Sequence, residues 1–332
     1  MGSLHSTAHS LHYHESVQAL FTRALLHTYL ASLFGSVPYI TTTDYTVNMN
    51  VSRQPATEVY GLAITDLEEA VQLLPEAYIS EGRARVNKFA AQAVLARCYL
   101  YNGDWAEASN AASAVLNSSL YALENDPAMV FLKNSQETIW HFSINYEGSP
   151  TDEALAFTLF TAPPTGTALT ESLINAFEPG DQRRTEWVGE VSDGADTWYY
   201  PAKYRQATPD AASSEYSVVL RLAEMYLVRA EARAMQGELM GALEDLNAIR
   251  ARAGLVASTA TTQQELLSAI LRERRVELFT EYGHRFFDLK RAGLLDAVLG
   301  TKPGWSATDA LLPAPQNELS VNPNLGPQNT GY

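Results

Sequence analysis

The chain has 332 residues, which is long enough to bury one large hydrophobic core or two ordinary ones. Hydrophobic residues make up 46% and charged residues 18% of the chain, a balance typical of globular proteins and not of disordered ones. The formal net charge is −15, and an acidic surface repels the phosphates of nucleic acids and of anionic lipids. Nucleic acid is therefore excluded as an expected partner.

Residues 1–14 predict a tail rather than a folded element. Several histidines occur in this stretch, and His5 and His9 have the i, i+4 spacing of metal ligands. Because no helix is secured there, we predict no metal site and no cofactor. No run of 18 apolar residues occurs that could span a bilayer, and the one cysteine, Cys98, lies in an apolar helical pattern where a buried thiol is expected.

Two segments have the spacing of tetratricopeptide-type helix pairs. In both, small and aromatic residues recur where the two helices of a pair approach closely. They are Ala96, Tyr99, Gly103, Trp105, Ala108 and Ala112 in the first segment, and Ala230, Gly237, Leu239, Ala242, Leu246 and Ile249 in the second. Gly103 is expected to end its helix with a positive φ. The pattern predicts a mostly α fold, a tetratricopeptide-like helix-pair scaffold.

A weaker helix pair is predicted nearer the start of the chain. Its two helices cover 15–34 and 57–74. Thr57 is expected to be the N-cap of the second helix, and Pro75 is expected to end it because proline cannot continue a helix.

A further helical unit, over 262–281, places an arginine on its apolar stripe. That arginine is Arg274, and a buried arginine requires a hydrogen-bonded carboxylate. The candidates are Glu277 one turn further along, and Glu224 or Glu231 in the preceding helix pair. We expect this cluster to be structural.

The composition changes between the helical blocks. Threonine, serine, glycine, proline and aromatic residues become frequent there, with short β-like stretches at 138–143 and 197–200. The chain is therefore expected to divide into a tail (1–14), N-terminal helical repeats (15–124), an irregular loop-rich insertion (125–217), and C-terminal helical repeats with a closing segment (218–332). Loops on a rigid scaffold are where binding usually occurs.

The sequence contains no catalytic motif that we can identify. No phosphate-binding glycine spacing follows a predicted strand, and neither a His-Glu-x-x-His motif nor a nucleophile elbow occurs. Acidic pairs of the glycosidase type have to be considered. Glu273, Glu277 and Glu281 alternate with arginines that would hold them ionised, while 152–153 and 193–196 have the character of solvated loops. We therefore expect no enzymatic activity.

Short motifs are spread from residue 15 to residue 332. They read FGSVP at 34–38, FEPGDQRR at 177–184, RLAEMYL at 221–227, LNAIRARAG at 246–254, GHRFFDLKR at 283–291 and QNTGY at 328–332. In this order they closely resemble the SusD/RagB family of outer-membrane glycan-binding lipoproteins. The resemblance implies a SusD-like scaffold of helix pairs, whose inserted region and adjacent loops present a carbohydrate-binding surface.

The resemblance also implies a place of action. Members of the family serve polysaccharide utilisation at the cell surface, on the outer membrane, as a lid on a SusC-like TonB-dependent transporter that takes up oligosaccharide or sometimes peptide. They carry a lipid-anchored cysteine and a helical stretch upstream of the motif at 34–38. This chain shows neither, so we expect it to be an N-terminally truncated member whose signal peptide and lipid anchor are absent.

Candidate ligand residues rest on expected exposure, because the binding residues of the family vary among its members. Sugar rings have apolar C–H faces that lie on aromatic rings, and side-chain amides bind their hydroxyls. The candidates are Trp187, Trp198, Tyr199 and Tyr200 in the insertion, and Tyr45, Asn48 and Asn50 after the Val-Pro turn. Trp140 lies in a β-like apolar alternation and is expected in the core.

Two other functions stay open. Tetratricopeptide-type pairs often hold peptides in a concave groove, which would make the protein a peptide- or protein-binding interaction module. Aromatic residues outside that groove favour sugar, whereas asparagine, lysine and arginine lining it favour peptide. A hydrolase is the third possibility, which a turnover assay on polysaccharides decides.

Overall fold

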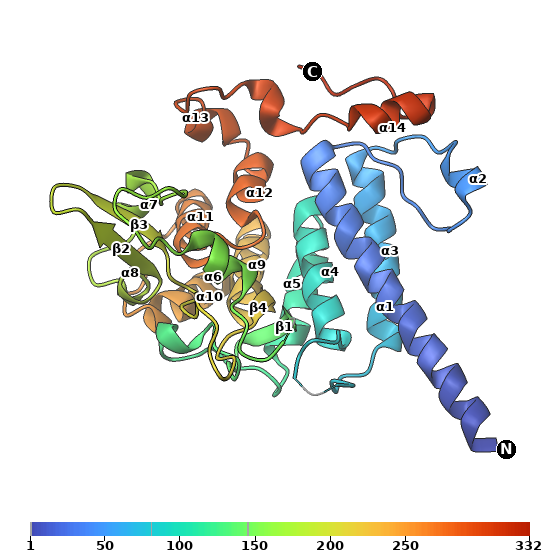
Figure 1. Ribbon diagram of the computed structural model, residues 1–332, viewed down its shortest axis with the longest axis horizontal. Coiled ribbons are helices and arrows are strands. Elements are labelled where there is room, and N and C mark those ends of the chain that lie inside the picture. The colour runs from blue at the N-terminus through green and yellow to red at the C-terminus, as the bar shows by residue number, and fades with distance from the viewer. Residues whose placement is uncertain (1, 81, 145) are drawn as a thin grey trace.

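The computed structural model describes residues 2–80, 82–144 and 146–332, with side chains described from residue 16 onward. Helices dominate it, which confirms the mostly α fold predicted from the sequence (Figure 1). The long helices of the first part are α1 (Gly2–Phe34), α3 (Ala56–Leu73), α4 (Lys88–Asn102) and α5 (Trp105–Leu116). Those of the last part are α9 (Leu222–Met235), α10 (Leu239–Arg252), α11 (Gln263–Glu277) and α12 (His284–Arg291).

Short elements connect the long helices. The short helical elements are α2 (Tyr45–Asn48), η1 (Pro127–Met129), α6 (Asp152–Phe157), α7 (Glu171–Ile174), α8 (Gln182–Glu186), α13 (Leu295–Leu299), η2 (Ala307–Ala310), α14 (Gln316–Val321) and η3 (Pro323–Leu325). The strands form two antiparallel pairs, β1 (Thr138–Phe142) with β4 (Ser217–Arg221) and β2 (Val188–Ser192) with β3 (Thr197–Pro201).

Local signals explain where the predicted helix pairs begin and end. The side chain of Asn87 caps α4 by accepting a hydrogen bond from the backbone N–H of Ala90 at 3.0 Å. Gly103 ends the helix with φ +88°, as the sequence predicts, and Gly237 plays the same part between α9 and α10 with φ +82°. Thr262 opens α11 with a capping box.

The structure corrects two sequence predictions about helix starts. Residues 2–14, for which the sequence predicts a tail, are the first turns of α1, which projects beyond the other helices (Figure 1). Neither proline nor glycine interrupts residues 3–34 to stop the helix earlier. The side chains of residues 1–15, including the His5 and His9 pair, lie outside the described residues. Helix α3 begins after Pro55, whose backbone holds the N-cap position, so Thr57 is not the cap.

The hydrophobic core runs through the helix pairs. Its largest part joins α1, α3, α4 and α5 to β1, β4 and α9, and it contains Cys98, fully buried, and Trp140, 8% exposed, as the sequence predicts. A second part lies between α9, α10 and α11. A third belongs to the insertion, where Phe131, Trp187 and Tyr204 pack against Phe279 of the scaffold.

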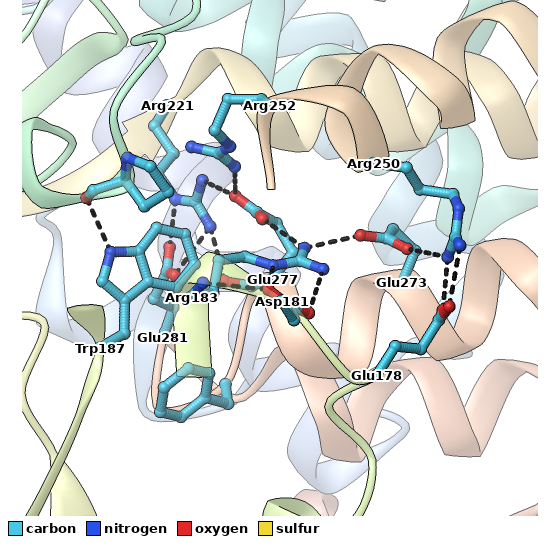
Figure 2. A network of polar contacts seen from close by, with 12 residues as sticks. Glu178, Asp181, Arg183, Trp187, Arg221, Arg250, Arg252, Glu273, Glu277 and Glu281 are labelled. Carbon is cyan, nitrogen blue, oxygen red and sulfur yellow. Dashed lines mark hydrogen bonds and ion pairs between the residues drawn. The ribbon is translucent and has the colours of Figure 1, made fainter. Parts of the chain in front are cut away.

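A buried ionic network joins the insertion to the C-terminal helices (Figure 2). At its centre Glu277 accepts hydrogen bonds from Arg183 at 2.8 Å, from Arg221 at 2.5 Å and from Arg252. Burial alone would raise the pKa of Glu277, but the three guanidinium charges hold it well below its ordinary value. Because Arg183 comes from the insertion, this charge pairing fixes the insertion on its scaffold.

Arg274 forms a separate buried pair. Its Nε donates to Asp288 Oδ2 at 2.8 Å, and Asp288 also accepts from Arg291 at 2.8 Å. A carboxylate partner and a structural position are found as expected, but the expected identity is wrong, since none of Glu277, Glu224 and Glu231 hydrogen-bonds to Arg274. The reason is that α12, the next helix along the chain, packs on α11 and brings Asp288 to the buried arginine.

Candidate functional site

The aromatic residues of β3 divide between the two faces of the β2–β3 hairpin. Tyr200 pairs with Gly189 and Trp198 with Val191, so Trp198 and Tyr200 share one face, while Tyr199 lies on the other. The ring of Tyr200 lies across Gly189, where an added Cβ would stand 2.3 Å from the ring carbon Cζ. The missing side chain of Gly189 therefore lets this ring lie close against the strand. Trp198 and Tyr200 are both half-buried.

Tyr199 points toward the body of the insertion. It packs against the buried cluster that contains Trp187 and Phe131. The guanidinium carbon of Arg184 lies 4.7 Å from the centre of its ring, which covers one ring face. Tyr199 therefore lies on the face of the hairpin that packs on the insertion, and not on the face that carries Trp198 and Tyr200.

Trp187 is not exposed, and here the expectation from the sequence is wrong. Its exposed fraction is 1%, and its Nε1 donates a hydrogen bond to the carbonyl of Pro127 at 2.8 Å (Figure 2). The charged groups of Lys203 and Arg252 lie 4.9 Å and 5.3 Å from the centre of its rings. The indole covers the cations of the buried network, so it supports the site from beneath and does not present a surface to a ligand.

The second group of candidates lies on the loop that carries α2. Tyr45 is 76% exposed, while the side-chain amides of Asn48 and Asn50 donate to the carbonyls of Thr42 at 2.8 Å and Thr46 at 3.0 Å. The amide N–H groups are thus used to shape the loop, and the Tyr45 ring is left free for contact.

The structure does not bring the two groups together. Figure 1 shows α2 and the β2–β3 hairpin at opposite ends of the long axis of the molecule. The candidates therefore do not form one continuous aromatic patch. They form a hairpin face with Trp198 and Tyr200, and a separate loop with Tyr45.

A polar cleft of about 750 Å³ lies beside β1 and β4, and no sequence motif indicates it. His141 stacks on Tyr216 there with ring centres 4.6 Å apart, and Lys133 Nζ lies 5.1 Å from the Tyr216 ring centre and 3.7 Å from Glu147. Arg83 donates to the carbonyls of 135, 136, 138 and 120, which shapes one wall. Burial lowers the pKa of His141, so the ring is neutral near pH 7.

Most of the acidic residues considered for catalysis have structural partners. Glu273, Glu277 and Glu281 are paired with arginine or lysine inside the protein. Asp193 accepts hydrogen bonds from the turn backbone at 195 and 196, and Glu153 accepts from Ser217. Among the described side chains, no group of His, Cys, Asp and Glu is arranged to hold a metal ion. In the same part of the chain, no helix combines the length and the apolar character that a membrane span needs.

Stacked helix pairs that carry an irregular insertion define the class of fold, and comparison with known proteins shows the family. Residues 188–332 match the sequence profile of the SusD family, and residues 8–100 match a profile described as starch-binding associating with outer membrane. SusD-like protein P2 of Formosa agariphila is 30% identical in an alignment that covers 96% of this chain and 74% of that protein.

Solved structures agree with these matches. A laminarin-binding SusD-like protein, 26% identical, superposes with a TM-score of 0.79 over 95% of this chain and 78% of its own. A SusD superfamily protein from Parabacteroides distasonis, 27% identical, superposes with a TM-score of 0.77 over 95% of this chain and 78% of its own. The chain belongs to the SusD family, as the resemblance of its motifs indicates.

Proposed function

We propose that this protein binds oligosaccharide at the outer-membrane surface, without catalysis, and delivers it to a SusC-like TonB-dependent transporter. Membership of the SusD family supports carbohydrate as the ligand, as does the likeness to a laminarin-binding relative. The outer-membrane location is supported by the description of the profile that matches residues 8–100.

The observation that carries the proposal is the hairpin face of Trp198 and Tyr200. Two half-buried rings project from the same side of β3, and Gly189 beneath them leaves one ring flat against the strand. Flat aromatic rings suit the apolar C–H faces of sugars. Two such rings on one face can contact two sugar units of the same oligosaccharide.

The test begins with a glycan array on the purified chain, followed by isothermal titration calorimetry with the oligosaccharide that binds best. Trp198→Ala should weaken binding about 30-fold, since truncating an aromatic anchor costs about 2 kcal/mol. Trp305→Ala is the matched control: Trp305 is also half-buried, but its Nε1 donates to Asp296 in the C-terminal segment, at 2.9 Å.

Three outcomes decide between the possible readings. Loss with Trp198→Ala and Tyr200→Ala, but not with Trp305→Ala, supports the hairpin site. Unchanged affinity in both hairpin variants, with loss on Tyr216→Ala, moves the site to the polar cleft. An array on which no glycan is bound contradicts the function itself. Co-purification with a SusC-like transporter from native membranes tests the delivery step.

A further inference from the structure

An open groove of about 440 Å³ crosses three consecutive helices, α3, α4 and α5. These helices belong to the side of the molecule away from the β2–β3 hairpin (Figure 1). The residues that line the groove are Glu68, Val71 and Gln72 from α3, Gln92, Leu95 and Tyr99 from α4, and Glu107, Asn110 and Ala111 from α5. We call it the amide groove, because each helix contributes one side-chain amide.

The three side-chain amides of the groove are free to bind a ligand. Gln72, Gln92 and Asn110 make no hydrogen bond to any group in the described part of the chain. Other amides of the protein are engaged; Asn87, for example, caps α4. Each free amide offers a donor and an acceptor side by side, which is the same pair that a peptide bond presents.

The groove is also acidic. Tyr99 donates its hydroxyl to Glu68 at 2.6 Å, and both burial and this bond raise the pKa of Tyr99, so the hydroxyl stays protonated. Glu107 adds a second carboxylate. No lysine, arginine or histidine is among the described residues that line the groove, so its two negative charges are uncompensated there.

Helix spacing matches an extended peptide. Packed helices lie about 8–10 Å apart, and an extended chain advances about 3.3 Å per residue, so every third residue of such a chain meets the next helix. We propose that the amide groove holds an extended peptide segment that carries lysine or arginine. Its backbone amides pair with Gln72, Gln92 and Asn110, and its cations pair with Glu68 and Glu107.

A peptide suits the groove better than a sugar does. A neutral sugar would leave both carboxylates uncompensated, and the one ring available, Tyr99, is tied through its hydroxyl to Glu68. This partner site is separate from the proposed glycan site, so either proposal can fail while the other stands.

The probe is a fluorescein-labelled nine-residue alanine peptide with lysine at positions 2, 5 and 8, and its counterpart with glutamate at those positions. Fluorescence anisotropy should show binding of the lysine peptide only, weakening as salt rises from 50 to 500 mM because the contact is partly ionic. Gln92→Ala with Asn110→Ala should weaken it about 10-fold, the loss of two hydrogen bonds. Glu68→Gln with Glu107→Gln should abolish the preference for lysine.

Matched controls separate these effects from a general loss of charge or of folding. Glu244→Gln, on an exposed position of α10, and Gln264→Ala, on an exposed position of α11, should leave peptide binding unchanged. Far-UV circular dichroism of every variant checks that it is folded. Equal affinity for the lysine and glutamate peptides, absence of binding at millimolar peptide, or oligosaccharide binding that is lost with Gln92→Ala and Asn110→Ala overturns the proposal.

Discussion

Removing one arginine from the buried network should destabilise the protein strongly. Arg183 is fully buried, and it donates to Asp181 at 2.8 and 2.9 Å, to Glu277 at 2.8 Å, and pairs with Glu273 at 2.6 Å (Figure 2). Arg183→Met keeps much of the volume of the side chain and removes its charge and its donors. The carboxylates then remain buried with fewer partners.

The magnitude follows from what each carboxylate retains. Glu277 keeps its bonds to two other arginines, and Glu273 keeps Arg250 at 3.2 Å, but Asp181 loses the one salt bridge that it makes within the described residues. Removing one partner of a buried pair costs about 3–5 kcal/mol, because the remaining charge stays desolvated. Since two of the three carboxylates keep an arginine, we expect the lower end of this range, about 3 kcal/mol.

The neighbouring residue supplies the control. Arg184→Met removes an arginine that is only half-buried and lies over the Tyr199 ring, a contact worth about 0.5–1 kcal/mol. Unfolding in urea, followed by circular dichroism, is suitable because urea, unlike guanidinium chloride, does not screen the charges. Equal unfolding midpoints for the two variants would refute the reasoning, since burial would then not decide what a lost charge costs.

Other substitutions probe single features of the structure. Burial lowers the pKa of His284 to about 4, so between this pH and the unfolded value of about 6.5 only the unfolded chain binds the proton. The free energy of unfolding should therefore fall as pH drops through that window, by at most about 1.4 kcal/mol per pH unit. His284→Asn should flatten this part of a urea-unfolding pH series. Gly103→Ala should lower the free energy of unfolding by about 1–2 kcal/mol because φ is +88° there. Gly61→Ala, inside α3 with open space around the added methyl, should raise it by about 0.5–1 kcal/mol. The thermal unfolding midpoints of the two variants should shift in opposite directions. Gly189→Ala should displace the Tyr200 ring and weaken glycan binding as much as Tyr200→Ala does, and calorimetry that shows full affinity would remove that ring from the site.

Local spacing alone was enough to predict the helix pairs. The positive φ at Gly103 and the burial of Cys98 and Trp140 follow from residues within one helix or one strand. Such features depend on backbone preference and on periodic apolar positions, which a linear sequence displays directly. The family resemblance rests on the same kind of local motif, and it is confirmed by the matches to SusD-like proteins.

What the sequence could not show depends on contacts between distant segments. Glu277 meets Arg183, Arg221 and Arg252 across separations of 94, 56 and 25 residues. The partner of Arg274, the burial of Trp187 beneath the hairpin and the distance between Tyr45 and Trp198 were likewise decided only when the helices packed. The identity of an arginine, a tryptophan or a glutamine does not reveal whether its side chain is buried, exposed or without a partner. That environment is set by the charges and surfaces that folding brings to the side chain.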